Sequence, residues 1–320
     1  MKAYRANRLG GPQALALGEA GEPVPGPGDA IITVEAVGLN LVDLAALAGE
    51  RQPRPGLPFT PGVEIAGRVA GGEGLGGRIV AFVPWGGLAE RVVARREACV
   101  AVPDSLDASQ AAALPLAYAG ALMALEGKAR LMAGQDLLVL GAGGGAGLAA
   151  IAIGKLLGAR VIGAANGAER LAQAKAHGAD QVFDSGLTAV AEATREATGG
   201  KGADVVFDPV GGDASTAALA ALAEGGRIVA AGFAGGRASP LNPARLYLLG
   251  GELLTANTVL EVERNPVAAR DALARVVAWT AEGRLSPRIA AQFAFADVRH
   301  ALDYVGSRKG SGAVIVKIET

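Results

Sequence analysis

The chain has 320 residues, which is enough to bury a large hydrophobic core and favours two domains over one. Its 30 Lys and Arg residues nearly balance its 31 Asp and Glu residues, and no run of like charges stands out. The charge pattern therefore gives no indication of a nucleic-acid partner, and we expect the ligands to be small molecules.

A single cysteine, Cys99, excludes an intramolecular disulfide and a four-thiolate zinc site. We expect it to be a small buried or half-buried side chain. Met1 leads directly into Lys2-Ala3-Tyr4-Arg5, without the apolar segment that follows the charges of a signal peptide. These features predict a cytoplasmic protein in a reducing compartment.

Two uncharged stretches, residues 108–125 and 137–154, approach the roughly 18 to 20 residues that cross a bilayer. The first contains Ser109, Gln110 and Pro115, and the second is interrupted at its centre by a glycine cluster that disfavours helix. We therefore expect neither stretch to span a membrane.

The first hundred residues are predicted to be rich in β-strands. Short apolar runs at residues 31–37, 63–69, 78–83 and 89–93 are separated by turns that contain glycine and proline.

From about residue 108 onward, apolar strands alternate with alanine-rich helices. The expected strands are residues 137–140, 160–164, 181–183, 205–207, 227–231 and 253–258, and the helices between them are residues 147–157, 168–177, 187–198 and 213–223. This alternation predicts a parallel sheet with helices on both faces. A long helix over residues 266–281, with Asn265 as its N-cap and Pro266 as its first residue, then precedes a final strand at 313–318.

A glycine-rich loop, LLVLGAGGGAGL at residues 137–148, carries the clearest local signal. A buried strand runs through the glycines into a helix, so main-chain amides and the positive end of the helix dipole can meet a pyrophosphate. The expected contacts with a dinucleotide are Gly143, Gly144, Gly145, Ala146 and Gly147. Methyltransferases carry similar loops, so the loop alone does not exclude S-adenosylmethionine as the ligand.

The end of the second strand bears on the choice between NADH and NADPH. NAD-specific sites place a carboxylate about 20 residues after the loop, and here Ala165 stands at that position. No Asp or Glu occurs between residues 137 and 168, so we expect no acid beside a 2′-phosphate. Asn166 and Arg170 stand where they could bind that phosphate, which favours NADPH; the alternative for Arg170 is an exposed helix position.

Four segments together resemble one known family. They are VGLNLVD at residues 37–43, PFTPGVEIAG at 58–67, the glycine loop, and ADVVFDPVGG at 203–212. Their order and spacing, along nearly the whole chain, resemble the quinone oxidoreductase branch of the medium-chain dehydrogenase/reductase superfamily, the group that includes zeta-crystallin.

The resemblance implies an α/β protein with two domains. A GroES-like, β-rich catalytic domain would comprise residues 1–118 and 257–320, and a doubly wound Rossmann domain with a parallel sheet would bind NADPH with residues 119–256. The active site of such proteins is the cleft between the domains. Family members commonly form homodimers through the last strand of the Rossmann sheet, for which residues 253–258 are the candidate.

Zinc is not expected. Zinc-dependent relatives place cysteine where Asn40 stands and histidine where Val63 stands, and neither residue is a plausible ligand. Glu64 is then a single carboxylate, and His177 and His300 lack the spacing of a ligand pair. Both histidines are expected at the surface.

The resemblance also suggests which side chains act. Asn40 would lie against the nicotinamide and the substrate, although it could simply cap a loop. Asp43 is expected to orient Asn40 or its loop, with proton relay as the alternative. Tyr118 could face the pocket or be a buried helix residue, and Trp85 could line the cleft. Arg51 stands near a position where quinone oxidoreductases often carry tyrosine.

Two further turns are implied to contact the cofactor. Pro209 and Val210, in the segment 207–212, would pass beneath it, and Gly232 and Phe233 would offer main-chain groups to the carboxamide. The alternative for both is an ordinary turn at the end of a strand.

The expected activity is hydride transfer from NADPH to a quinone. The first alternative is reduction of an α,β-unsaturated ketone, aldehyde or enoyl thioester. A second alternative is a non-enzymatic protein that binds NADPH as a structural ligand, as some family members do. A methyltransferase is the third, and the segment 203–212 argues against it.

Overall fold

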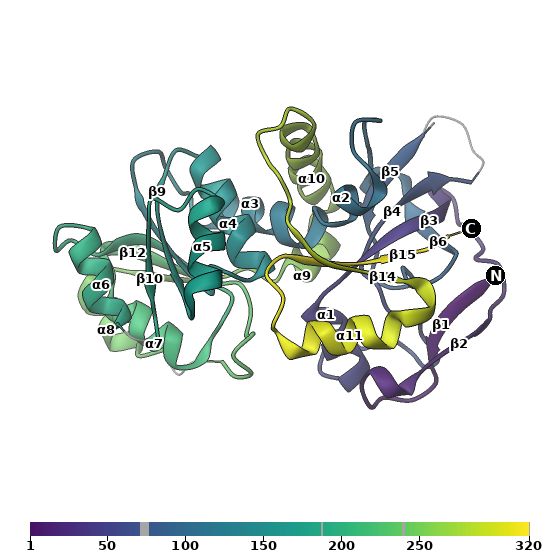
Figure 1. Ribbon diagram of the computed structural model, residues 1–320, viewed down its shortest axis with the longest axis horizontal. Coiled ribbons are helices and arrows are strands. Elements are labelled where there is room, and N and C mark those ends of the chain that lie inside the picture. Colours follow the sequence, from purple (N-terminus) through teal and green to yellow (C-terminus); the bar gives the residue numbers. More distant parts are fainter. Residues whose placement is uncertain (71–76, 187, 239–240, 320) are drawn as a thin grey trace. The chain divides into compact units, whose positions relative to one another are not determined.

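The computed structural model describes residues 1–70, 77–186, 188–238 and 241–319 (Figure 1). The chain divides into two compact units, each considered by itself. The first unit comprises Met1–Leu116 and Val262–Thr320, and the second unit comprises Ala117–Glu261. The boundaries predicted from the sequence, after residues 118 and 256, lie within a few residues of these.

The first unit is built on a seven-stranded sheet, as the β-rich start of the chain predicts. Six strands follow the order β14-β15-β3-β4-β5-β7, and β6 pairs with β3. All neighbours are antiparallel except β14 and β15. The strands are β3 (Asp29–Leu39), β4 (Glu64–Val69), β5 (Arg78–Phe82), β6 (Arg91–Arg95), β7 (Cys99–Ala101), β14 (Ile289–Ala294) and β15 (Ala313–Lys317). A separate antiparallel pair joins β1 (Lys2–Ala6) and β2 (Leu15–Glu19).

Helices of the first unit lie between and after these strands. They are α1 (Leu41–Ala48), α2 (Ala108–Ala112), α10 (Pro266–Ala281) and α11 (Val298–Ser307), with short 3₁₀ turns η1 (Pro12–Ala14), η2 (Arg96–Ala98) and η5 (Phe295–Asp297). The predicted start of α10 is confirmed, because Asn265 Oδ1 accepts from the Ala268 amide at 3.3 Å and Pro266 is the first helical residue. Helix α1 is not among the elements predicted from the sequence.

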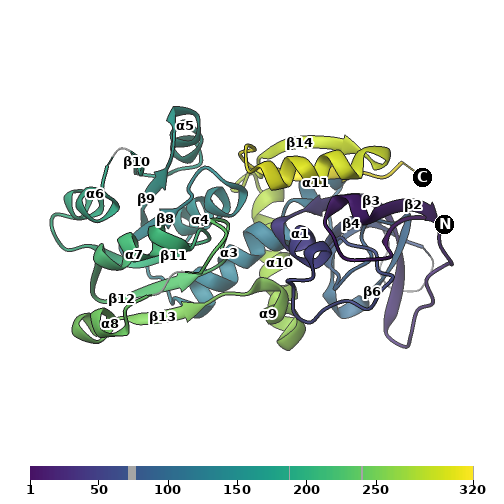
Figure 2. The same cartoon turned by 90° about the horizontal axis from the view of Figure 1, so that it is seen from below.

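The second unit contains the predicted parallel sheet. Its strand order is β10-β9-β8-β11-β12-β13, which Figure 2 lets the reader follow across the unit. The strands are β8 (Asp136–Leu140), β9 (Arg160–Ala165), β10 (Gln181–Asp184), β11 (Ala203–Asp208), β12 (Leu222–Ala230) and β13 (Glu252–Thr255). The helices are α3 (Gly120–Leu122), α4 (Gly145–Leu156), α5 (Ala168–Ala176), α6 (Val190–Ala197), α7 (Gly212–Ala220) and α8 (Pro243–Leu249).

This strand order is that of a doubly wound Rossmann sheet. The chain moves outward in one direction from β8 to β10 and in the other from β11 to β13. The switch point therefore lies between β8 and β11, where such sheets bind ligands at the carboxyl ends of their strands. Each unit has its own cluster of buried apolar side chains.

Two predicted element boundaries are wrong. The strand expected at 253–258 ends at Thr255, and Thr258–Arg264 forms a helix, α9, because Asn257 Oδ1 accepts from the Leu260 amide at 3.2 Å and so caps its start. The helix expected at 213–223 ends at Ala220, and Leu222 already belongs to β12. The helix expected at 187–198 is α6, and Leu187 lies outside the described residues.

A helical stretch at Ala108–Lys128 runs through α2, the π-helical turns η3 (Pro115–Ala119) and η4 (Met123–Lys128), and α3. Among the described residues it is long and apolar enough to cross a bilayer by length and composition alone. Because 72% of its most apolar window is buried, as in a core helix, it is only a weak argument for a membrane span.

Candidate functional site

The glycine loop joins β8 to α4 in a turn that needs glycine. A Cβ atom at position 147 would lie 2.2 Å from the carbonyl oxygen of Gly141 and 2.8 Å from Cα of Ala142. Gly141 itself has a φ of +58°, in the left-handed region that favours glycine. Gly147 therefore lets the first turn of α4 pack directly against the end of the strand.

The amino end of α4 presents main-chain donors. Gly144 is its N-cap residue, and Leu148 makes the first helical bond, from its amide to the Gly144 carbonyl at 2.9 Å. The amides of Gly145, Ala146 and Gly147 precede that bond, so they have no helical acceptor. Together with the positive end of the helix dipole, they form a cradle for an anionic group such as a pyrophosphate.

Arg170 lies next to the glycine loop. A Cβ atom at Gly143 would lie 2.4 Å from Cβ and 3.0 Å from Cα of Arg170, so the first turn of α5 packs on this glycine. The structure thus brings together two of the predicted cofactor residues that lie far apart in the chain. The close approach of Arg170 to the loop leaves no room for a side chain at position 143 and so requires glycine there.

An acid that was not predicted for this site lies beside the end of β9, on the neighbouring strand. Asp184 ends the neighbouring strand β10 and pairs in register with Ala165. Its Oδ2 accepts from the Gly167 amide at 3.0 Å and its Oδ1 from the Gly186 amide at 2.8 Å. The expectation that no acid lies beside this turn is therefore wrong, because a parallel neighbour supplies one. Both carboxylate oxygens are already bonded to main-chain amides.

Asn166 is held by the same turn. Its Oδ1 accepts a hydrogen bond of 2.5 Å from the hydroxyl of Ser185, which follows β10. The structure therefore places Asn166 and Arg170 at the same end of β9, on either side of Gly167 and close to the glycine loop.

The turn after β11 is organised by a buried carboxylate. Asp208 Oδ1 accepts from the amides of Val210 at 2.8 Å and Gly211 at 3.0 Å, and its Oδ2 accepts from the hydroxyl of Ser215. Val210 also faces the glycine loop, since a Cβ atom at Gly141 would lie 2.9 Å from its Cγ2. The turn at 209–212 is thereby fixed against the loop after β8.

The turns after β11 and β12 are joined by main-chain hydrogen bonds. The carbonyl of Pro209 accepts from the Ala234 amide at 2.9 Å, and that of Val210 accepts from the Gly235 amide at 2.6 Å. Gly232 lies close to Pro209, because a Cβ atom there would lie 3.2 Å from the Pro209 carbonyl oxygen. Phe233 is 56% exposed. All the predicted cofactor residues of the second unit thus lie at the carboxyl edge of one sheet.

In the first unit, Asn40 lies between β3 and α1 as the N-cap of α1, and a capping box joins its side chain to the Asp43 amide, so the predicted alternative of a capping residue is confirmed. Its Nδ2 donates to Glu64 Oε1 at 2.6 Å, and its main-chain amide donates to Asp43 Oδ2 at 2.9 Å. Asp43 Oδ1 accepts from the Gly62 amide at 3.0 Å, so this carboxylate ties the start of α1 to the turn before β4. Asn40, Asp43 and Glu64 form a connected set, which we call the Asn40 cluster.

Both acids of the Asn40 cluster are buried, and both titrate close to neutral pH. Burial raises the pKa of Asp43 to about 6, against the lowering effect of the Asn40 and Gly62 amides. Burial raises the pKa of Glu64 to about 7, against its hydrogen bonds from the Leu116 amide and Asn40. Perturbed acids of this kind are typical of functional sites, although buried networks also produce them.

Arg51, predicted to stand near a position where the resembling family often has tyrosine, packs on an aromatic ring. Its guanidinium carbon lies 4.4 Å from the ring centroid of Trp85, and its Nη1 donates to the Pro84 carbonyl at 2.8 Å. A buried cation therefore stacks on the Trp85 ring.

The donor set of the first unit does not fit zinc. Asn40 donates to Glu64 through its amide, and Val63 is buried and apolar. The Cys99 thiol donates to the Arg95 carbonyl, and burial raises its pKa to about 11, so it is no thiolate at neutral pH. Across residues 1–70, 77–186, 188–238 and 241–319, no group of three or more His, Cys, Asp or Glu side chains could hold a metal.

Tyr118 lies in η3 and is buried. It belongs to the second unit, whereas Asn40 and Asp43 belong to the first. His177 caps the end of α5, with Nδ1 2.8 Å from the Gln173 carbonyl, and His300 is exposed on α11.

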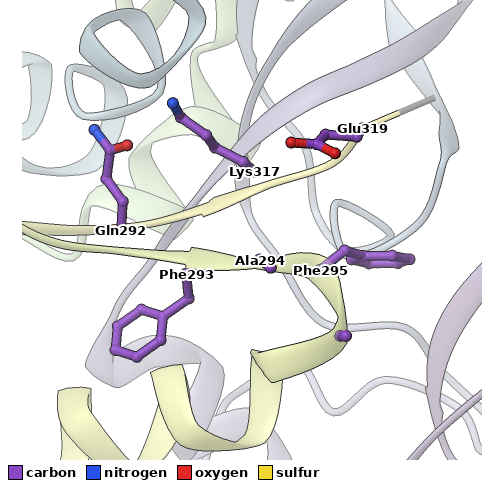
Figure 3. Close-up of a pocket in the computed structure, with 7 residues that line it drawn as sticks. Gln292, Phe293, Ala294, Phe295, Lys317 and Glu319 are labelled. Carbon is purple, nitrogen blue, oxygen red and sulfur yellow. The ribbon is translucent and has the colours of Figure 1, made fainter.

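Two hollows in the first unit are lined by residues outside the Asn40 cluster. One of about 410 Å³ borders β14 and β15, where Figure 3 shows Gln292 and Lys317 pointing to one side of the strands and Phe293 to the other. Its remaining lining residues are Ala294, Phe295, Ala296 and Glu319. A second hollow, of about 320 Å³, lies near Ser105 and Pro287. Neither contains a residue that the sequence analysis predicted for the site.

Comparison with known families matches both units. Residues 26–104 match the alcohol dehydrogenase GroES-like domain, and residues 145–263 match the family described as zinc-binding dehydrogenase. Quinone oxidoreductase-like protein 2 from Bos taurus is 34% identical over 304 residues, covering 92% of this chain and 86% of its own length.

Solved structures agree with this assignment. The quinone oxidoreductase from Thermus thermophilus, which was also determined in complex with NADPH, is 34% identical with a TM-score of 0.86, covering 99% of this chain and all of its own. An NAD-dependent alcohol dehydrogenase is 27% identical with a TM-score of 0.90 and covers both chains completely. The fold is thus shared by proteins described with either nicotinamide cofactor.

Proposed function

Because the chain belongs to the quinone oxidoreductase branch of the medium-chain dehydrogenase/reductase superfamily, we propose that this oxidoreductase passes a hydride from NADPH to a quinone without zinc. The observation that carries the proposal is the glycine turn at Gly141–Gly147, which opens main-chain amides at the switch point of a Rossmann sheet. The donor set around Asn40, which does not fit zinc, supports the metal-free reaction.

Residues of the second unit would hold the cofactor. The amides of Gly145, Ala146 and Gly147 would bind the pyrophosphate, and Asn166 and Arg170 would bind the 2′-phosphate. Gly143 and Gly144 would let the cofactor approach the loop. The joined turns at 209–212 and 232–236, with Pro209, Val210, Gly232 and Phe233, would lie along the nicotinamide half. When bound, the reduced nicotinamide supplies the hydride.

The first unit would orient the acceptor and polarise its carbonyl oxygen. Without a Lewis acid this polarisation falls to hydrogen-bond donors, and Asn40 is the candidate that would touch cofactor or substrate. Asp43 would fix its backbone. Tyr118, which is buried in the second unit, is the further candidate hydroxyl. Correct juxtaposition of donor and acceptor carbons can contribute on the order of 7 to 11 kcal/mol, so positioning would supply most of the rate.

A panel of acceptors tests this proposal. The protein is expected to oxidise NADPH, followed at about 340 nm, in the presence of 1,4-benzoquinone or 1,2-naphthoquinone. Methyl vinyl ketone and crotonyl thioester serve as enone and enoyl-thioester acceptors. Turnover with those alone would favour the enone alternative, and tight NADPH binding without any turnover would favour the non-enzymatic one.

Arg170→Ala tests the 2′-phosphate contact. A charge-assisted bond to phosphate contributes about 1.5 to 3 kcal/mol, so the KM for NADPH is expected to rise by roughly 10- to 100-fold while that for NADH hardly changes. Lys175→Ala is the matched control, since Lys175 lies on the same helix and donates to the Asp180 carbonyl. Equal effects of Arg170→Ala on the two cofactors would remove Arg170 from the phosphate site.

A homodimer is part of the proposal. β13 ends the sheet of the second unit, and the neighbouring α8 exposes Tyr247 by 85% and Leu248 by 76%. An edge strand beside exposed apolar side chains is suited to pairing with a second copy. Light scattering should give twice the chain mass of 31.8 kDa, and the double variant Tyr247→Lys/Leu248→Lys should give the monomer mass. An unchanged mass in the variant would exclude this surface.

A further inference from the structure

The carboxyl group of Asp208 lies buried at the end of β11, where the residue is 2% exposed. Both of its oxygens accept hydrogen bonds: Oδ1 from the amides of Val210 and Gly211, and Oδ2 from the hydroxyl of Ser215. A buried donor or acceptor that loses its partner is costly, so these three bonds hold the carboxyl group and the turn after it in one arrangement.

Ser215 connects this turn to the helix that follows it. Its side chain is buried on α7, one helical turn after the N-cap residue Gly211. Gly211 has a φ of +77°, and a Cβ atom there would lie 2.5 Å from the Arg237 carbonyl oxygen, so this path of the chain requires glycine. The Ser215 hydroxyl therefore ties the Asp208 carboxyl group to a helix that begins directly at the turn.

Main-chain hydrogen bonds link this turn to the segment after β12. The carbonyl of Asp208 accepts from the Ala231 amide at 2.7 Å, and the carbonyls of residues 209–210 accept from the amides of residues 234–235 at 2.9 and 2.6 Å. Between these bonded positions, the amides of residues 232–233 have no main-chain acceptor in the part of the chain that the structure describes. Three bonds thus fix the path of the segment and leave two amides available to a ligand.

These two amides lie at the edge of the sheet where a dinucleotide would bind. Gly232 and Phe233 follow β12, which pairs with β11 at the switch-point side of the sheet. The turn before them packs against the glycine loop, since a Cβ atom at Gly141 would lie 2.9 Å from Val210 Cγ2. Gly232 is half-buried and Phe233 is exposed, so solvent reaches this segment. Main-chain donors in such a place suit a carbonyl oxygen such as that of the nicotinamide carboxamide.

We propose that Asp208 is a positioning residue for the nicotinamide half of the cofactor, with Ser215 as its anchor. The Asp208 side chain itself does not touch the cofactor; it acts through the turn at 209–211 and the amides of residues 232–233. The inference rests on the proposed NADPH site. Binding of the adenosine half does not depend on Asp208, because the turn at 166–170 follows a different strand, β9.

Calorimetric titration with NADPH and with 2′,5′-ADP, which lacks the nicotinamide half, tests the proposal. Asp208→Ala removes the acceptor of two amides, so the Kd for NADPH should rise by roughly tenfold or more while that for 2′,5′-ADP stays at the wild-type value. Ser215→Ala removes only the Oδ2 donor and should raise the Kd for NADPH by roughly 2- to 10-fold. Asp208→Asn keeps an oxygen for both amides and an NH₂ group for the Ser215 hydroxyl, so it should restore most of the affinity.

Asp213→Ala is the matched control, because Asp213 is an exposed acid on the same helix that pairs with Arg237, and it should leave both Kd values unchanged. An equal rise for the two ligands in Asp208→Ala would mean that Asp208 only maintains the sheet, and would overturn the proposal. So would a wild-type Kd for NADPH in Ser215→Ala, the variant that decides if Asp208→Ala does not fold. The titrations need no electron acceptor, so a lack of turnover would contradict the proposed hydride transfer while the role of Asp208 is still decided.

Discussion

Replacement of Gly147 by alanine is expected to weaken NADPH binding by roughly 10- to 100-fold. The added Cβ atom would lie 2.2 Å from the Gly141 carbonyl oxygen and 2.8 Å from Cα of Ala142, and both are main-chain atoms that cannot rotate away. Overpacking of this kind costs roughly 1 to 3 kcal/mol, and every 1.4 kcal/mol is a factor of ten in affinity. The strain would be relieved by displacing the amides that are proposed to hold the pyrophosphate.

Gly127→Ala provides the matched control. Gly127 lies in a helical turn of the same unit, is exposed, and has no atom within 4 Å of the position its Cβ would take. Calorimetric titration with NADPH should therefore give wild-type affinity for Gly127→Ala and a greatly raised Kd for Gly147→Ala. Wild-type affinity in a folded Gly147→Ala protein would show that the cofactor does not bind at this loop.

The free energy of unfolding of the first unit is expected to decrease as the pH rises from about 5 to about 8. Folding raises the pKa of Glu64 from 4.5 to about 7 and that of Asp43 from 3.8 to about 6. In this window the folded state binds more protons than the unfolded state, so stability is lost with rising pH. One pKa unit corresponds to about 1.4 kcal/mol, which makes each contribution on the order of 3 kcal/mol.

Tryptophan fluorescence can follow this unit alone. The chain has two tryptophans, Trp85 and Trp279, and both belong to the first unit. Urea unfolding at about pH 5 and about pH 8 should give a smaller difference in Glu64→Gln than in the wild type, because the neutral amide no longer titrates. Glu35→Gln should keep the wild-type difference. A stability that rises with pH, in the wild type, would contradict the raised pKa values of both acids.

The second unit was predictable from sequence because its signals are local. Each apolar strand is followed by a helix, and right-handed crossovers between parallel strands leave few alternative arrangements. The prediction placed the glycine loop and the turns at 166–170, 209–212 and 232–233 at strand ends, and a parallel sheet brings such ends to one edge. The start of α10 was equally local, since Asn265 and Pro266 specify a cap by themselves.

Features that depend on contacts between distant segments were missed. Asp184 meets Gly167 only because β10 lies beside β9 in register, and Glu64 meets Asn40 only because β4 pairs with β3. In the sequence Glu64 is a single carboxylate without zinc partners, and only the pairing of the two strands makes it the acceptor of Asn40. The error at 256–258 has a local origin instead, because Asn257 accepts from the Leu260 amide and so begins helix α9.

The joined turns after β11 and β12 have a consequence for how the protein can vary. The bonds from Ala234 and Gly235 to Pro209 and Val210 use main-chain amides, which every residue but proline supplies, and main-chain carbonyls, which every residue supplies. Exchanging the exposed Phe233 would leave this scaffold intact while altering the chemistry of the surface it displays. Protein engineers seeking a new acceptor range could therefore randomise that position and expect the nucleotide platform to survive.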